Sequence, residues 1–282
     1  MDMDMNLSEL YAAIHLQEEI IQKLEQPERK EALAQFEPYL ERMGRCETAK
    51  DAYRSLDACL TEDPDHLQML LCQLECARRC FDRYQEKGIP ADIFTDTMGC
   101  FSRFIGECGR RNGRLFWDRG WWVWRQVSMS LFRIGALEYE LITYEEKPAI
   151  SIHIPSDADF SPESVDLSLA QAGRFFAGYD PEYPRDTWIC DSWLLSPALT
   201  PLLPEGSHIL SFQRRFRILT ENCDARDYLE WLYAVPSDTP VEELPERTGL
   251  QRSVRKLLLE GGKAGTACGI LEAAKGIRSN PG

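Results

Sequence analysis

The sequence has no run of about 18–20 apolar residues, which is the length that a membrane-spanning helix requires. Its N-terminal stretch, MDMDMNLSEL, also lacks the basic-then-apolar order of a signal peptide. At 282 residues with 44% hydrophobic residues, the chain is long enough for one large domain or two ordinary ones. We therefore expect a soluble cytoplasmic protein with no membrane partner.

The chain has fewer basic residues than acidic residues. The chain has 32 Lys and Arg residues against 46 Asp and Glu residues, which gives a net charge of −14. A phosphate backbone requires a cationic surface, so this balance excludes nucleic acid as a general partner. It also disfavours adhesion to anionic lipid.

The ten cysteines do not form the pattern of a metal site or a disulfide framework. Cys72, Cys76 and Cys80 follow one stripe of one predicted helix, with Leu71 and Leu74 beside them. Metal sites usually use C-x-x-C turns, which bring two thiolates to one centre. We interpret the cysteines as small core residues of a reducing compartment and expect no metal.

The periodicity of apolar residues changes along the chain. Residues 7–112 repeat apolar positions at helical spacing and predict five antiparallel helices. From Leu131 the apolar residues alternate, which predicts strands at 131–142, 149–155, 187–193, 212–220 and 266–271, with helices between them. The sequence therefore predicts an α+β protein: an all-helical N-terminal domain, residues 1–125, and a mixed α/β C-terminal domain, residues 126–282.

Several sequence segments resemble those of a known family. These are GIPADIFTDT, LFRIGALEYEL, HIPSDADFSPESVDLSL, CDSWLLSPAL, ILSFQRRF and LPERTGLQRSVRKLLLEGGKAGTACG, which extend from about Gly88 almost to the end. As a set they are similar to the bacterial acyltransferase-domain-containing proteins. That family pairs a helical N-acyltransferase N-terminal domain with a GNAT-like C-terminal domain, and the resemblance implies the same pair here.

The resemblance implies an N-acyltransferase that uses acyl-CoA or acetyl-CoA as co-substrate. The acyl group would move to an amine of a small molecule or peptide by direct attack on the thioester, without a covalent enzyme intermediate. The alternative, from another class, is a non-catalytic ligand-binding or protein-binding module whose GNAT-like domain has lost its cofactor loop. The oligomeric state is not encoded in any pattern that we find.

The cofactor loop departs from the family pattern. GNAT enzymes hold the pyrophosphate on a loop of the form Q/R-x-x-G-x-G/A before a helix, where backbone N–H groups face the anion. The matching residues 156–160 here read SDADF, in which Asp157 and Asp159 would repel a phosphate. Acidic capping of the following helix explains the same residues equally well.

Cationic residues for a phosphate lie elsewhere. Strand alternation in SFQRRFRILT predicts that Arg215 and Arg217 share one face, and an arginine pair can bind an anion bidentately. Lys263, in EGGKAGTACG, is a third candidate. The alternatives are pairing of the arginines with nearby acids and capping of a helix by the glycines.

His153 is the histidine best placed for proton transfer. In AISIHIP the isoleucines share one strand face, and His153 shares the other with Ser151. A histidine at a strand end can act as a base near neutral pH. Glu138, in GALEYEL, is a candidate carboxylate base. Structural bonding of His153 and exposure of Glu138 on an edge strand are the alternatives.

Asp191 and Ser192 interrupt the apolar strand TWICDSW. Buried polar groups need partners, because an unmade hydrogen bond costs about 1–3 kcal/mol. These residues either line a cleft at the carboxyl end of the strand, next to His153, or hold the turn that follows. Cys190 has no neighbouring histidine, which disfavours it as a nucleophile.

Overall fold

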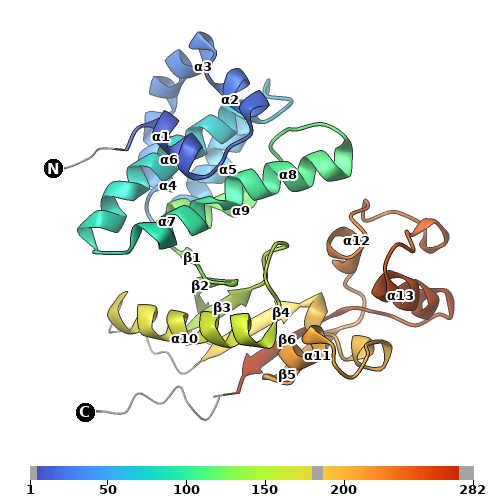
Figure 1. Ribbon diagram of the computed structural model, residues 1–282. Coiled ribbons are helices and arrows are strands. Elements are labelled where there is room, and N and C mark those ends of the chain that lie inside the picture. The colour runs from blue at the N-terminus through green and yellow to red at the C-terminus, as the bar shows by residue number, and fades with distance from the viewer. Residues whose placement is uncertain (1–4, 180–186, 273–282) are drawn as a thin grey trace, which may run out of the picture. The chain divides into compact units, whose positions relative to one another are not determined.

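The computed structural model describes residues 5–179 and 187–272 (Figure 1). The chain divides into two compact units, Met1–Ile134 and Gly135–Gly282. The helical first part and the mixed-sheet second part are those that the sequence predicts, so the α+β class is confirmed. No described helix is both long and apolar enough to cross a membrane.

The first unit is helical in all of its described elements up to β1 (Leu131–Ile134). Its helices are α1 (Leu7–Ala13), α2 (Glu18–Leu24), α3 (Pro27–Ala32), the 3₁₀ turn η1 (Leu33–Phe36), α4 (Glu37–Met43), α5 (Ala49–Cys59), α6 (Leu67–Glu86), α7 (Ala91–Met98), α8 (Cys100–Asn112) and α9 (Gly120–Val127). The expected five helices are thus too few, because short breaks divide the longer periodic stretches.

The first break shows how this happens. Asn6 and Glu9 form a capping box at the start of α1, so the helix begins as expected. His15 then adopts a left-handed backbone with φ 53°, which no α-helix continues through. Apolar periodicity persists across the break, so the sequence pattern alone predicts one helix where the structure has two.

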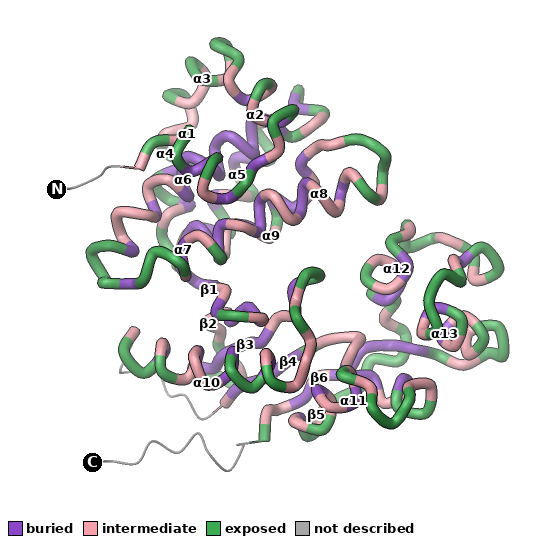
Figure 2. The backbone as a smooth tube through the Cα atoms, viewed as in Figure 1, coloured by how far each residue is buried: buried purple, intermediate pink, exposed green. Residues whose placement is uncertain are grey.

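Helix α6 is the centre of the first unit, and Figure 2 shows buried residues along it. Gln73 is fully buried within it. Its Nε2 donates to the carbonyl oxygen of Gly120 at 2.8 Å. Its Oε1 accepts from the indole N–H of Trp117 at 2.9 Å. Because Trp117 is also buried, this single amide connects α6 to α9 and to the segment before it.

We predict that Gln73→Leu lowers the free energy of unfolding by about 2 kcal/mol or more, since two buried polar groups would each lose a partner. Urea denaturation monitored by tryptophan fluorescence measures this loss. Gln22→Leu, on the exposed side of α2, is the matched control and should change stability little. Equal stability of the two variants would show that the Gln73 bridge contributes nothing.

The second unit contains a mixed sheet, and helix α10 (Pro162–Tyr179) packs against it. Its strands are β2 (Leu137–Tyr144), β3 (Lys147–His153), β4 (Trp188–Ser192), β5 (Phe216–Asn222) and β6 (Thr266–Leu271). The sheet order is β1-β2-β3-β4-β6-β5. β3 and β4 are parallel, while β2 with β3, β4 with β6 and β5 with β6 are antiparallel.

Helix α10 (Pro162–Tyr179) packs on one face of the sheet. The Ser168 hydroxyl lies 2.8 Å from the Tyr139 hydroxyl and accepts from the backbone N–H of Leu137. The rings of Tyr139, Phe176 and Trp188 meet edge to face. The face of β2 that carries Tyr139 is therefore buried, and the alternate residues of β2 lie on the other face.

The remaining short helices are η2 (Trp193–Leu195), η3 (Pro197–Leu202), α11 (His208–Gln213), α12 (Tyr228–Trp231), η4 (Val241–Glu243) and α13 (Gly249–Leu259). A second apolar cluster, which includes Leu199, Tyr228 and Val254, packs η3, α12 and α13 together. Thr248 and Gln251 form a capping box that begins α13.

One strand prediction is wrong in its first half. Residues 211–213 of the segment SFQRRF belong to α11, because the Ser207 side chain accepts from the backbone N–H of Ile209 and begins a helix there. β5 starts only at Phe216. Arg215 therefore precedes the strand, and it does not share a strand face with Arg217 as the alternation predicted.

Candidate functional site

The parallel strands β3 and β4 pair over a short distance. Their register consists of Ile150 opposite Trp188 and Ser151 opposite Ile189. Beyond this point β3 stays paired with β2, where Glu138 lies opposite His153. β4 stays paired with β6, where Asp191 lies opposite Cys268. The pairing of the two strands thus ends before their carboxyl ends at His153 and Ser192.

The register places His153 and Asp191 level with each other. Ser151 and Ile189 are paired, and His153 and Asp191 each follow two residues later on the same face. That face is opposite to the one that carries Trp188 and packs on α10. β3 and β4 are neighbouring strands, as the sequence predicts, and a functional role of the two residues stays a prediction.

His153 has a carboxylate partner that sequence reasoning did not identify. Its Nε2 lies 2.9 Å from Oε2 of Glu140 on β2. Both side chains are largely buried, with exposed fractions of 23% for His153 and 12% for Glu140. Glu138, the predicted candidate, lies directly opposite His153 in register and is buried on the same face. The alternating acids of GALEYEL contain both residues, but only the fold shows which one contacts the imidazole.

Asp191 is exposed and has further acidic neighbours. Partial desolvation, and then the negative charges of Asp191 and Glu230, raise the pKa of Asp227 above its ordinary value. Burial and the charge of Asp191 also raise the pKa of the Cys268 thiol, which lies opposite Asp191 on β6. The carboxyl end of β4 therefore has a negative potential.

Ser192 and Cys190 lie on the other face of β4. The Ser192 hydroxyl accepts from the backbone N–H of Leu194 at 3.1 Å and so caps η2. This contact is the structural role that the sequence left open as an alternative. Cys190 is buried, and burial raises the pKa of its thiol, so the thiolate that a nucleophile requires is disfavoured.

Ser161 caps α10, because its hydroxyl accepts from the backbone N–H of Ser164 at 3.4 Å, and Asp159 of the SDADF loop supports this cap. Its carboxylate accepts from the backbone N–H of Ser161 at 3.0 Å and from the hydroxyl of Ser164. These hydrogen bonds, that of Ser164 first, lower the pKa of Asp159 below its ordinary value. The carboxylate thus lies near the start of the helix, where a phosphate would otherwise be attracted.

The three predicted cationic residues differ in their environments. Arg215 donates to Asp166 at 2.9 Å and 2.8 Å, to the Ser211 hydroxyl at 3.1 Å and to the Pro162 carbonyl at 3.3 Å, so it connects α11 to α10. Arg217 is 61% exposed, and its nearest acid, Glu272, is 3.9 Å away. Lys263 is also exposed and pairs with Asp224. The structure therefore separates these residues instead of forming one anion site.

The cysteines are free thiols. Burial raises the pKa of Cys72 and of Cys80 to about 12, as expected for thiols inside a helical core. In the part of the chain that the structure describes, no group of three or more His, Cys, Asp and Glu residues is arranged to hold a metal ion.

Two family models match this chain. A GNAT-like C-terminal domain matches residues 131–271, and an N-acyltransferase N-terminal domain matches residues 5–129. No curated protein matches the chain.

Solved structures of acyltransferases have a similar fold. One, in complex with decanoyl-CoA and teicoplanin, is 22% identical, with a TM-score of 0.80 over 94% of this chain and 87% of that one. Another, in complex with CoA and 10C-teicoplanin, is 20% identical, with a TM-score of 0.80 over 97% and 90%. A third, in complex with decanoyl-CoA, is 22% identical, with a TM-score of 0.66 over 96% and 100%. At these identities the similarity establishes the fold.

We predict that Asp159→Ala lowers the melting temperature near neutral pH, because the start of α10 loses the hydrogen bonds that Ser161 and Ser164 donate to this carboxylate. The folded pKa of Asp159 lies below the ordinary value of 3.8, so its contribution is present above that value and is lost as the pH falls through the folded pKa. The difference from wild type should therefore shrink in acid. Thermal unfolding across a pH series measures it, with the exposed Asp238→Ala as control. A difference that grew in acid would contradict this account.

Proposed function

The chain belongs to the acyltransferase family that joins an N-acyltransferase N-terminal domain to a GNAT-like C-terminal domain, and on this premise we propose that it transfers an acyl group from acyl-CoA to an amine. Decanoyl-CoA and CoA are bound to acyltransferases of the same fold, which supports a CoA thioester as donor. Teicoplanin is bound to two of them, which supports an amine acceptor of peptide or small-molecule type.

The parting of β3 and β4 carries this proposal. The strands pair at Ile150 and Ser151 only, and each then follows another neighbour. GNAT strands part in this way beside their cofactor, so the thioester would lie in the opening with its carbonyl carbon near the carboxyl ends. We assign His153 and Asp191, near the carboxyl ends of β3 and β4, to the two sides of that opening, as a base and an acidic group beside the reacting atoms.

The reaction is a direct transfer. The amine nitrogen attacks the carbonyl carbon, the new C–N bond forms, and the C–S bond breaks as CoA leaves as its thiolate. His153 accepts the proton that the nitrogen loses, and the Glu140 carboxylate orients the ring and stabilises the imidazolium. The thiolate then takes up a proton to give CoA. Asp191 and buried Glu138 add negative charge that attracts a cationic acceptor.

Charge for the phosphates comes from residues outside the acidic loop in this proposal. Arg215 is engaged with Asp166 and two backbone carbonyls, so we assign it to holding α11 on α10. Arg217 and Lys263 are exposed and make single, solvent-screened ion pairs that an anion can displace at little cost. We place the reaction in the bacterial cytoplasm, where acyl-CoA is available and thiols such as those of this chain stay reduced.

One observation favours a second candidate function. Asp159 already occupies the start of α10, and a carboxylate there competes with a pyrophosphate. A non-catalytic module that binds a ligand or another protein would have this feature. The two candidates differ in whether decanoyl-CoA is bound and consumed.

We predict that His153→Ala lowers kcat for acyl transfer by about 10²–10⁴-fold, the usual contribution of a general base, while the melting temperature changes little. Release of CoA from decanoyl-CoA in the presence of primary amines and lysine-containing peptides measures the rate. Glu140→Gln and Asp191→Asn should also reduce it. His15→Asn is the control, because Asn tolerates the left-handed backbone at that exposed position. Full activity of His153→Ala would show that His153 is not the base. A wild-type protein that neither binds nor consumes decanoyl-CoA would favour the binding module.

We predict that the double variant Arg217→Glu, Lys263→Glu weakens decanoyl-CoA binding at least tenfold at low salt, because two attractive charges become repulsive. Titration calorimetry at low and high salt measures the effect, which salt should reduce. Lys256→Glu, an exposed lysine of α13, is the matched control. An unchanged affinity in the double variant would exclude both residues from the phosphate site.

A further inference from the structure

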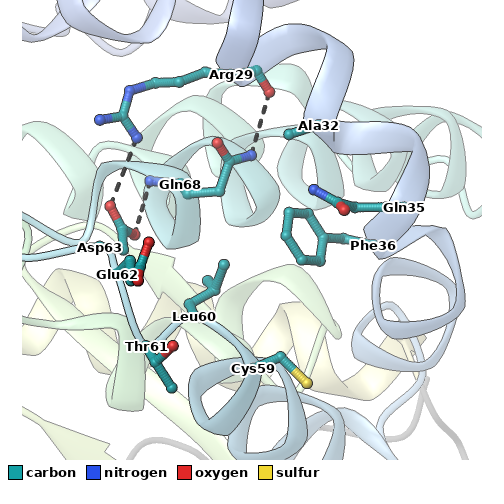
Figure 3. A pocket seen from close by; sticks show the side chains of 10 residues that line it. All are labelled: Arg29, Ala32, Gln35, Phe36, Cys59, Leu60, Thr61, Glu62, Asp63 and Gln68. Atoms are coloured by element: carbon teal, nitrogen blue, oxygen red, sulfur yellow. Dashed lines mark hydrogen bonds and ion pairs between the residues drawn. The ribbon is translucent and has the colours of Figure 1, made fainter.

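A cavity lies within the helical unit, apart from the residues discussed so far. It has a volume of about 320 Å³, is partly open to solvent, and is lined by residues of α3, η1, the end of α5, the segment that follows it and the start of α6 (Figure 3). A volume of this size falls within the range of sites for small ligands. Its lining combines one cation, two acids and several apolar side chains.

The buried acid of this cavity, Asp63, is already stabilised. Its Oδ2 accepts from the backbone N–H of Gln68 at 2.9 Å and of Met69 at 3.0 Å. These are donors of the first turn of α6, so the helix N-terminus compensates much of the carboxylate charge. The Asp63 carboxylate therefore does not depend on a neighbouring cation for all of its charge compensation.

Arg29 is the cation beside it. Its Nη1 lies 3.6 Å from Oδ1 of Asp63, which is too long for a hydrogen bond. Its Nε is buried and makes no hydrogen bond within the described residues, although the side chain as a whole is 27% exposed. Gln68 donates from its side chain to the Arg29 carbonyl and holds the α3 backbone against α6. Arg29 Nε is thus an N–H donor without a partner among the described residues.

The rest of the lining combines apolar residues with the polar residues Gln35, Thr61 and Glu62. Ala32, Phe36 and Leu60 line it, and Figure 3 shows the Phe36 ring and the Leu60 side chain lying beyond the Arg29 and Asp63 end. Polar groups with orienting hydrogen bonds at one end and apolar groups along the body are the usual arrangement of a site for an amphipathic small molecule.

We propose that this cavity binds a small organic monocarboxylate, with its carboxylate on the Arg29 guanidinium and its apolar part against Phe36 and Leu60. A guanidinium binds a carboxylate bidentately and with high geometric preference. Glu62 and Asp63 in the lining disfavour a phosphate dianion, which would add two negative charges beside them. Arg29 disfavours an ammonium group at the same end. This site is independent of the acyl transfer proposed above.

Octanoate is the probe for this site, with octylammonium and 1-octanol as charge controls, all titrated into the full chain by calorimetry. We expect octanoate to bind once per chain and the other two to bind at least tenfold more weakly. Arg29→Gln should weaken octanoate binding at least tenfold, whereas Arg54→Gln, an exposed arginine of α5, should not.

Ala32→Phe fills the cavity without touching the Arg29 and Asp63 pair, so it tests the site even if Arg29→Gln is poorly folded. It should abolish octanoate binding, and Ala34→Phe, at an exposed position outside the cavity, should leave it unchanged. Octanoate that still binds to Ala32→Phe occupies another site, such as the acyl cleft, and overturns the proposal. Absence of binding to wild type, or equal binding of octylammonium, overturns it as well.

Discussion

The parallel pairing of β3 with β4 ends before either strand does, and the candidate site depends on that limit. If the two strands paired along their whole length, His153 and Asp191 would face each other across a closed sheet with no room for a thioester. Because β4 stays paired with β6 while β3 stays paired with β2, the polar residues at their carboxyl ends are not paired with each other. This is the position in an α/β sheet where ligands bind.

The buried side of the sheet fixes which residues reach that opening. Tyr139 lies under α10 with its hydroxyl near Ser168, and the same Ser168 accepts from the backbone of β2. A shift of one residue would exchange the two faces of β2, placing Tyr139 in the opening and the acids in the core. The hydrophobic packing on α10 therefore orients Glu140 toward His153, so the stability of the core and the geometry of the site have one origin.

The start of α10 shows where stability and function compete. Asp159 accepts hydrogen bonds from Ser161 and Ser164, and Arg215 connects the start of the helix to α11, so both charges serve the fold. A CoA pyrophosphate bound at the start of α10 would have to displace the Asp159 carboxylate or take Arg215 as its own partner. The proposed use of Arg217 and Lys263 resolves this competition, because those side chains are exposed and hold only surface ion pairs.

The sequence by itself determined the class of the protein and the local faces of its strands. Helical periodicity to about Asn112, alternation after Leu131, and the order of strands and helices around α10 are local signals, and each residue pattern carries its own period. The pattern of AISIHIP likewise placed His153 opposite the buried isoleucines. Local patterns failed where a helix cap or a left-handed residue changes the local structure, as at Ser207 and His15.

Only the tertiary structure decided which distant residues meet. The contact of His153 with Glu140 depends on how β2 and β3 pair and on where the side chains extend. The engagement of Arg215 with Asp166 joins residues far apart in the chain. The Arg29 cavity forms between helices that carry no shared motif. Periodicity encodes which face a residue occupies, but the partner across a face is set by packing, and packing depends on the whole chain at once.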